Sequence, residues 1–150
     1  MRYLGVDYGG KRVGIAISDT EGMMAFPHSV IANNSSLVES VVSLARSENV
    51  GAIVVGESRT YAGMDNPIMK QVRPFVIAVA ESSGVPVYFE PEFLTSREAG
   101  HIQGENHMHD AAAAAIILRS YLDKMLHREG RGGGTGVDLS EEEIEGVLGQ

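Results

Sequence analysis

Bulky and small positions alternate strictly near the start of the chain. In residues 13–18, valine and isoleucine alternate with glycine, alanine and serine, and this period of two predicts a β-strand. One face of this strand is bulky, and the other lets a second element approach closely. An apolar strand over residues 4–7 precedes it. Gly9-Gly10 between the two predicts a hairpin turn with positive φ, which glycine tolerates.

The rest of the chain divides into short apolar runs and segments with helical spacing. The predicted strands are 23–31, 51–56 and 85–89, and the predicted helices are 36–45, 65–83, a short helix opening at Thr95, and 107–127. Because a helix connects the third and fourth strands, the fourth is expected to run parallel to the first. The order β-β-β-α-β-α-β-α-α predicts an α/β protein with a mixed five-stranded sheet and helices on both faces.

Several local signals refine this prediction. Pro27 cannot donate to a strand ladder, which predicts an edge strand or a bulge. Ser36 and Glu39 have the spacing of a capping box at a helix start. Pro74 is expected to kink or break the second helix. A polar loop is predicted over 57–63, and the Ala-rich start of the last helix is narrow enough to pack on the small-residue face of the hairpin.

Composition indicates one globular domain over 1–127 and a separate tail over 128–150. The chain has 150 residues, of which 43% are hydrophobic, and no cysteine, so disulfides and thiolate metal sites are excluded. The tail is rich in glycine and acidic residues, which predicts a flexible linker. Without a long apolar run or a signal-like start, we expect no membrane association and a cytoplasmic location.

The net charge of −8 argues against a broad electrostatic grip on nucleic acid. The tail carries a disproportionate share of this charge. Carboxylates around a metal site would also add negative charge where divalent ions neutralise it. The acidity therefore lowers the expectation of nucleic-acid binding without excluding it.

Acidic residues and one histidine gather at the predicted strand ends and at the start of the last helix. In chain order they are Asp7, Glu57, Glu90, Glu92, His107 and Asp110. His107 and Asp110 are three residues apart and share one helix face. Each residue alone is better explained as a turn, loop, surface or cap residue. Together they form a set of oxygen ligands that suits Mg²⁺ or Mn²⁺, and two such ions can drive phosphodiester hydrolysis.

The chain resembles the YqgF/RuvX proteins, which are RNase H-like nucleases related to the RuvC Holliday-junction resolvase. The likeness runs through Leu4-Gly5-Val6-Asp7-Tyr8-Gly9, Arg12-Val13-Gly14-Ile15-Ala16, Ile53-Val54-Val55-Gly56 with Gly63, Glu92-Phe93-Leu94-Thr95-Ser96, and Asp110-Ala111-Ala112-Ala113-Ala114. The resemblance implies an RNase H-like fold and a catalytic triad of Asp7, Glu92 and Asp110. It also implies branched DNA or the 5′ end of precursor 16S ribosomal RNA as substrate.

The chain departs from the usual family pattern at two places. Pro91-Glu92-Phe93 stands where the family usually has Asp-Glu-Arg, and Glu90 is a hypothetical substitute for the lost aspartate. Glu57-Ser58-Arg59 replaces the usual Leu-Pro. An acid at this point, together with the His107-x-x-Asp110 spacing, resembles RuvC itself and the RuvC-type domain of RNA-guided nucleases. Whether Glu57 or Glu92 bridges the metals stays open.

The sequence therefore predicts a metal-dependent nuclease acting as a monomer or homodimer. Asp7, Asp110 and either Glu92 or Glu57 would hold the ions, and His107 would ligate or orient the water. Three cationic residues in the predicted loops could hold backbone phosphates or simply be solvated. They are Lys11, Arg12 and Arg59.

Two alternatives belong to other classes of protein. The altered Pro91-Glu92-Phe93 block would suit a non-catalytic nucleic-acid-binding module. The opening Gly-Val-Asp-x-Gly pattern also resembles the phosphate loop of sugar kinases and actin-like ATPases, although 150 residues cannot supply their second domain.

Overall fold

The computed structural model describes residues 1–59, 66–93 and 107–130. The elements are β1 (Arg2–Tyr8), β2 (Arg12–Ser18), β3 (Ala25–Ala32), α1 (Leu37–Ser47), β4 (Val50–Arg59), α2 (Met69–Ser83), β5 (Val87–Phe93) and α4 (His107–Gly130). The short helix predicted at Thr95 and most of the predicted tail lie outside the described residues. Within the described ranges, no helix has the length and apolar character needed to cross a membrane.

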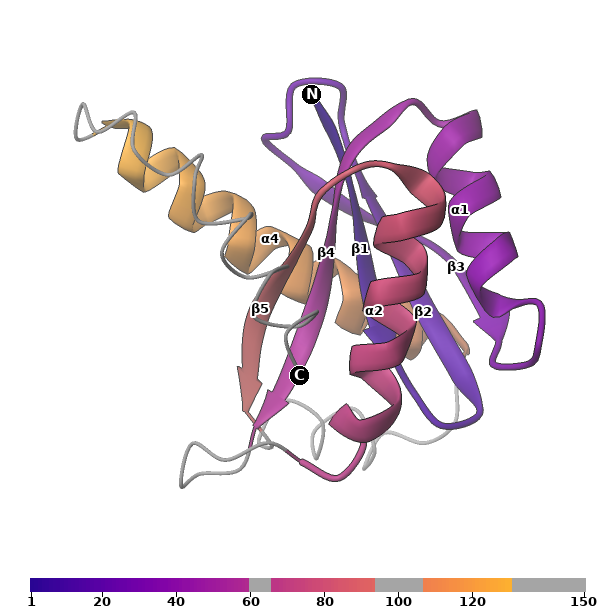
Figure 1. Ribbon diagram of the computed structural model, residues 1–150. Coiled ribbons are helices and arrows are strands. Elements are labelled where there is room, and N and C mark those ends of the chain that lie inside the picture. Colours follow the sequence, from indigo (N-terminus) through magenta and orange to yellow (C-terminus); the bar gives the residue numbers. More distant parts are fainter. Residues whose placement is uncertain (60–65, 94–106, 131–150) are drawn as a thin grey trace.

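The five strands form one mixed sheet in the order β3-β2-β1-β4-β5. β2 is antiparallel to both β1 and β3, whereas β4 is parallel to both β1 and β5. Helices α1 and α2 cover one face of the sheet, and α4 crosses the other (Figure 1). The predicted mixed sheet with helices on both faces is confirmed.

Side-chain alternation divides the interior into two layers of different width. On the α1/α2 face, the bulky side chains of β1, β2 and β4 form a continuous core that includes Leu4, Ile15 and Ile53. On the α4 face, the core is smaller and combines Ala16 and Val54 with residues of α4. The prediction of one bulky and one narrow face on the second strand is confirmed.

Three glycines let α4 lie directly on the sheet. A Cβ atom on Gly14 would overlap the carbonyl oxygen of Asp110. A Cβ on Gly5 would lie 2.8 Å from the Cβ of Leu118. A Cβ on Gly56 would lie 2.7 Å from Cδ1 of Ile117. At Gly14 and Gly5, α4 therefore lies closer to β2 and β1 than a larger residue at either position would allow.

Two strands extend further than the sequence pattern predicts. Ser58 pairs with Glu92 and Arg59 pairs with Phe93, so β4 and β5 both continue through polar residues. The acids predicted to follow these strands therefore lie within them. For Glu57 and Glu90 the physical reason is that arginine or lysine side chains pair with the carboxylate, so polarity alone does not end the strands.

The turns use different residues from those expected. Positive φ occurs at Gly22, Gly84 and Asn49 and not at Gly9-Gly10. Gly9 is needed instead because a Cβ there would overlap the carbonyl oxygen of Arg12. In the β2–β3 turn, the Asp19 carboxylate accepts hydrogen bonds from the backbone N–H groups of Met23 and Met24. These bonds hold the pKa of Asp19 below its ordinary value.

Helix ends and prolines also differ in part from the prediction. β3 is an edge strand, and the register shift opposite Pro27 confirms both features predicted there. Ser36 precedes α1 but makes no side-chain cap; its N–H donates to Oδ1 of Asn34 instead. Helix α2 continues as one element across Pro74. Helix α4 extends to Gly130, past the predicted domain boundary at 127.

Candidate active site

Asp7 lies on the α4 face of the central strand β1. It shares that face with Gly5, two residues earlier, because side chains alternate along a strand. Asp7 pairs with Gly14 of β2 and is only 9% exposed. On its other side, Val6 pairs with Val55 of β4, and the next residues along these parallel strands are Asp7 and Gly56. Asp7 therefore lies between two glycines.

Asp110 reaches this place from the first turn of α4. Its carbonyl oxygen lies against Gly14, the residue that pairs with Asp7. Its carboxylate forms an ion pair with Arg12, whose Nε lies 2.9 Å from Oδ2. Oδ2 is nevertheless buried without a hydrogen-bond partner, because the two groups are close but poorly aligned for a hydrogen bond. Asp110 Oδ2 thus has a positive charge beside it but receives no hydrogen bond.

Glu92 approaches from the other side of Asp7. It lies in β5 opposite Ser58, and its side chain is on the α4 face. A Cβ on Gly56 would lie 2.9 Å from Oε2 of Glu92, so the carboxylate rests against that glycine. Glu92 is 8% exposed. The two glycines flanking Asp7 are therefore the ones that Asp110 and Glu92 lie against.

The side chains on this face fit a divalent cation in kind. All three supply carboxylate oxygens, which hard cations such as Mg²⁺ and Mn²⁺ prefer. The buried Oδ2 of Asp110, which receives no hydrogen bond, is an acceptor suited to a cation. In the part of the chain that the structure describes, no three acidic or histidine side chains already converge as a metal site. Asp7, Glu92 and Asp110 share one face of the sheet, but the Asp110 carboxylate is paired with Arg12.

Glu57 lies on the opposite face of the sheet, and the structure does not bring it together with Asp7. Gly56 and Ser58 occupy the α4 face, so Glu57 between them faces α2. Its Oε1 is 2.8 Å from both Nε and Nη2 of Arg59, and its Oε2 is 3.8 Å from Nη2 of Arg73 in α2. The prediction placed Glu57 after its strand, where it could turn either way; within β4 its direction is fixed.

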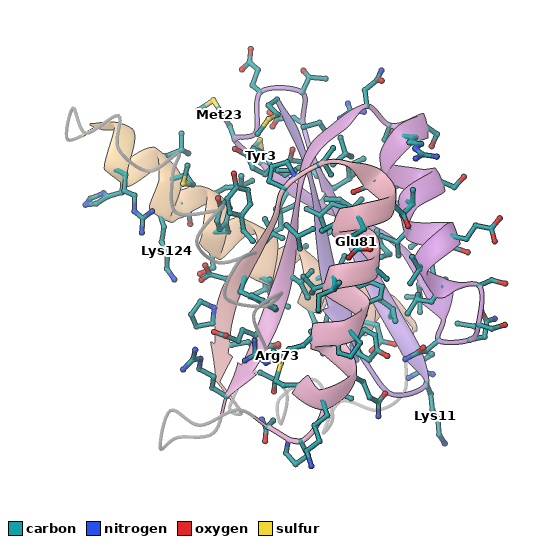
Figure 2. All side chains as sticks on the ribbon, viewed as in Figure 1. Tyr3, Lys11, Met23, Arg73, Glu81 and Lys124 are labelled. Carbon is teal, nitrogen blue, oxygen red and sulfur yellow. The ribbon has the colours of Figure 1, made fainter. Side chains whose placement is uncertain are left out.

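Glu90 is engaged elsewhere on the α4 face. Its carboxylate accepts hydrogen bonds from Oγ of Ser120 at 2.7 Å and from Nζ of Lys124 at 2.6 Å. Figure 2 shows Lys124 on the part of α4 remote from Asp110. Glu90 is 3% exposed. It joins β5 to α4, and nothing in this arrangement supports its substitution for the family's missing aspartate.

The remaining predicted site residues are dispersed along the same end of the sheet. His107 begins α4, but its side chain lies outside the described residues. Lys11 extends away from the sheet at the β1–β2 turn (Figure 2), and Arg59 is paired with Glu57. Sequence reasoning missed Arg73, which stacks over Phe89 with its Cζ 5.6 Å from the ring centroid. Arg73 belongs to no sequence motif, and it comes close to Glu57 only because α2 packs on that face of the sheet.

The strand order and the two helical layers define an RNase H-like fold of the RuvC type. Thermus thermophilus RuvC, solved in complex with a Holliday junction substrate, superposes with a TM-score of 0.57 at 19% identity, covering 84% of this chain and 96% of RuvC. The fowlpox virus Holliday junction resolvase superposes with a TM-score of 0.50 at 15% identity, covering 83% and 99%. At these identities the likeness concerns the fold.

The family is shown by sequence. The family model described as "RuvX: Holliday junction resolvase" matches residues 1–124, and the chain belongs to this family. A protein of Nitratidesulfovibrio vulgaris named "Putative pre-16S rRNA nuclease" is 37% identical over 126 residues, covering 83% of this chain and 85% of the relative. A relative of the same name from Oleidesulfovibrio alaskensis is 37% identical over 133 residues, covering 82% and 92%.

Proposed function

We propose that this chain is a divalent-metal-dependent nuclease that hydrolyses phosphodiester bonds in structured nucleic acid. The observation that carries the proposal is the placement of Asp7, Glu92 and Asp110 on one face of the sheet, around Gly14 and Gly56. The family description and the names of the relatives support the same reaction class. We place the reaction in the cytoplasm.

In this proposal Asp7, Glu92 and Asp110 would hold Mg²⁺ or Mn²⁺, one ion or two. The metal would acidify a bound water and neutralise charge on the phosphate. Asp7 is the central ligand because it lies on the middle strand, while Glu92 and Asp110 close the site from β5 and α4. We assign His107 to accept a proton from the attacking water or to orient it. The water oxygen would bond to phosphorus as the bond to the leaving oxygen breaks; the proton of the water would pass to His107 or to solvent, and the leaving oxygen would take a proton from solvent.

Cations along the same end of the sheet would hold the backbone of the substrate. Lys11 in the β1–β2 turn, Arg12 at the start of β2 and Arg59 at the end of β4 are proposed to contact phosphates, which position a nucleic acid without reading its sequence. Arg59 is held by Glu57, so Glu57 serves here as a positioning residue for a cation. This replaces its predicted role as a metal ligand.

Substitution of the two glutamates separates these roles. We expect Glu92→Gln to lower Mg²⁺-dependent cleavage by about a hundredfold or more, as should Asp7→Asn. Glu57→Gln should leave the turnover rate within about threefold and raise the KM, because it loosens Arg59 and not a metal ligand. The assay measures cleavage of labelled nucleic acid under saturating Mg²⁺ or Mn²⁺. Loss of turnover in Glu57→Gln with retention in Glu92→Gln would reverse the assignment.

The choice of substrate needs a separate experiment. Four-way junction, duplex DNA, single-stranded DNA and precursor ribosomal RNA can be compared at equal concentration, alongside the mass of the protein in solution. Junction resolution needs two active sites, so it requires a stable homodimer. Cleavage of the RNA by a monomer would assign the ribosomal role that the relatives' names suggest.

A non-catalytic binding module is the second candidate, and the altered Pro91-Glu92-Phe93 block is the observation that favours it. Retained affinity for RNA or branched DNA, with no Mn²⁺ binding and no cleavage of any of the four substrates, would support this candidate over the nuclease.

A further inference from the structure

Arg12 and Asp110 form an ion pair at the candidate metal face, and this pair joins the two elements that carry the site. Arg12 begins β2, and Asp110 lies in the first turn of α4. The Arg12 Nε lies 2.9 Å from Oδ2 of Asp110, and the two side chains are 33% and 30% exposed. Both side chains are therefore partly exposed, although the paired Oδ2 atom of Asp110 is itself buried.

The alignment of this pair is poor even though its atoms are close. Asp110 Oδ2 is buried and receives no hydrogen bond, so the guanidinium supplies positive charge without satisfying the acceptor. The Asp110 backbone cannot shift toward the sheet to improve the alignment, because its carbonyl oxygen already lies against Gly14. A small cation approaching Oδ2 would therefore meet a carboxylate whose backbone is fixed against Gly14. The Arg12 side chain that pairs with this carboxylate is the part that can move.

We infer that Arg12 is an internal counter-ion that competes with the divalent cation for Asp110 and is released toward the substrate phosphate when the cation binds. The inference rests on the proposed function. Without metal, Arg12 offsets the mutual repulsion of Asp7, Asp110 and Glu92. With metal, the cation takes over this role, and a guanidinium next to the reaction centre becomes free for the phosphate backbone. Metal loading and substrate binding are thereby coupled.

The first test measures Mn²⁺ affinity by calorimetry without nucleic acid. Arg12→Gln keeps much of the side-chain length but removes the charge. It should bind Mn²⁺ about two- to fivefold more tightly than the parent, the range expected for a partly exposed ion pair. Lys11→Ala is the matched control, because it also removes one positive charge, at the position next to Arg12. The Lys11 side chain is exposed and, within the described residues, has no ion pair with Asp110. This substitution should leave the affinity nearly unchanged.

The second test follows the Arg12 side chain directly. The ¹⁵Nε–Hε resonance of Arg12, assigned by its loss in Arg12→Gln, should shift during a Mg²⁺ titration of the parent. It should not shift in Asp110→Asn. Thermal unfolding of each variant without metal shows that it is folded.

The outcomes distinguish this inference from the proposed function. Equal or weaker Mn²⁺ binding by Arg12→Gln, with normal binding by the parent, overturns the inference and leaves the metal site standing. If Lys11→Ala tightens Mn²⁺ binding as much as Arg12→Gln does, the change in affinity comes from the general loss of positive charge, and the inference is also overturned. Failure of the folded parent to bind Mn²⁺ overturns both the inference and the metal-dependent nuclease.

Discussion

Single glycines decide how closely the acids of the candidate site approach one another. Gly14 lies beneath the Asp110 backbone, and Gly56 lies beside the Glu92 carboxylate. Both neighbour Asp7 across the sheet. A side chain at either position would occupy the space through which α4 or the glutamate reaches the central strand. The site therefore depends on two residues that contribute no ligand.

Gly14→Ala tests this dependence. The added methyl group would overlap the Asp110 carbonyl oxygen, so α4 must move away from β2. We expect a loss of about 1–3 kcal/mol in the free energy of unfolding and weaker Mn²⁺ binding, measured by denaturant titration and calorimetry. Gly10→Ala is the control, because a Cβ there has nothing within 4 Å. Equal effects of the two substitutions would show that α4 does not depend on this close approach.

Helix α4 holds both the site and the fold through different parts of its length. Its first turn carries Asp110, its middle packs on Gly5 through Leu118, and its later turns hold Glu90 through Ser120 and Lys124. The buried Glu90 carboxylate needs Lys124 as a charged partner, because an unpaired charge in the interior is strongly unfavourable. The polar contact therefore fixes where α4 lies along β5.

Lys124→Met should destabilise the protein through Glu90. Complete removal of a buried partner costs about 3–5 kcal/mol, but Lys124 is 54% exposed, so water compensates in part and we expect about 1–3 kcal/mol. Adding Glu90→Gln should recover part of this loss, since the interior charge is then removed. Arg119→Ala, which breaks an exposed pair with Asp123 on the same helix, is the control. An equally small effect at Lys124 would contradict the proposed contact.

The sequence pattern predicted the elements far better than their ends. Alternation in 13–18 correctly predicted the narrow face and its Ala-rich partner helix, because period-two patterning depends directly on burial. The polar run after Gly56 is typical of a loop, although Glu57 and Ser58 belong to β4. Polarity is a poor guide where a distant residue such as Arg73 neutralises the charge, since such pairing depends on tertiary structure.

At the scale of the whole molecule, the sheet separates two charged groups onto its opposite faces. Asp7, Glu92 and Asp110 lie on the α4 face, while Glu57 with its arginines lies on the α2 face. The sequence alone left Glu57 and Glu92 as equal candidates because both follow apolar runs. Only the register of β4 and β5 distinguishes them.

Metal removal should therefore change the stability of the entire domain. A cation bound to the folded state at a hundred times its Kd raises the free energy of unfolding by about 2.7 kcal/mol. We expect Mn²⁺ to raise the Tm of the parent and of Glu57→Gln, and EDTA to reverse the change. Asp7→Asn and Glu92→Gln should show little shift. A Tm that does not respond to Mn²⁺ in the parent would argue against a metal site on the α4 face.

The position of α4 over β2, β1 and β4 has a consequence for the order of events during synthesis. The strand that carries Asp7 leaves the ribosome early, whereas the helix that carries Asp110 and covers Gly5 and Gly14 is translated last among the described elements. A nascent chain that has made only the sheet exposes its narrow face and lacks one member of the acidic set. If this chain cleaves ribosomal RNA precursors, its nuclease site is therefore incomplete until the ribosome has translated Asp110.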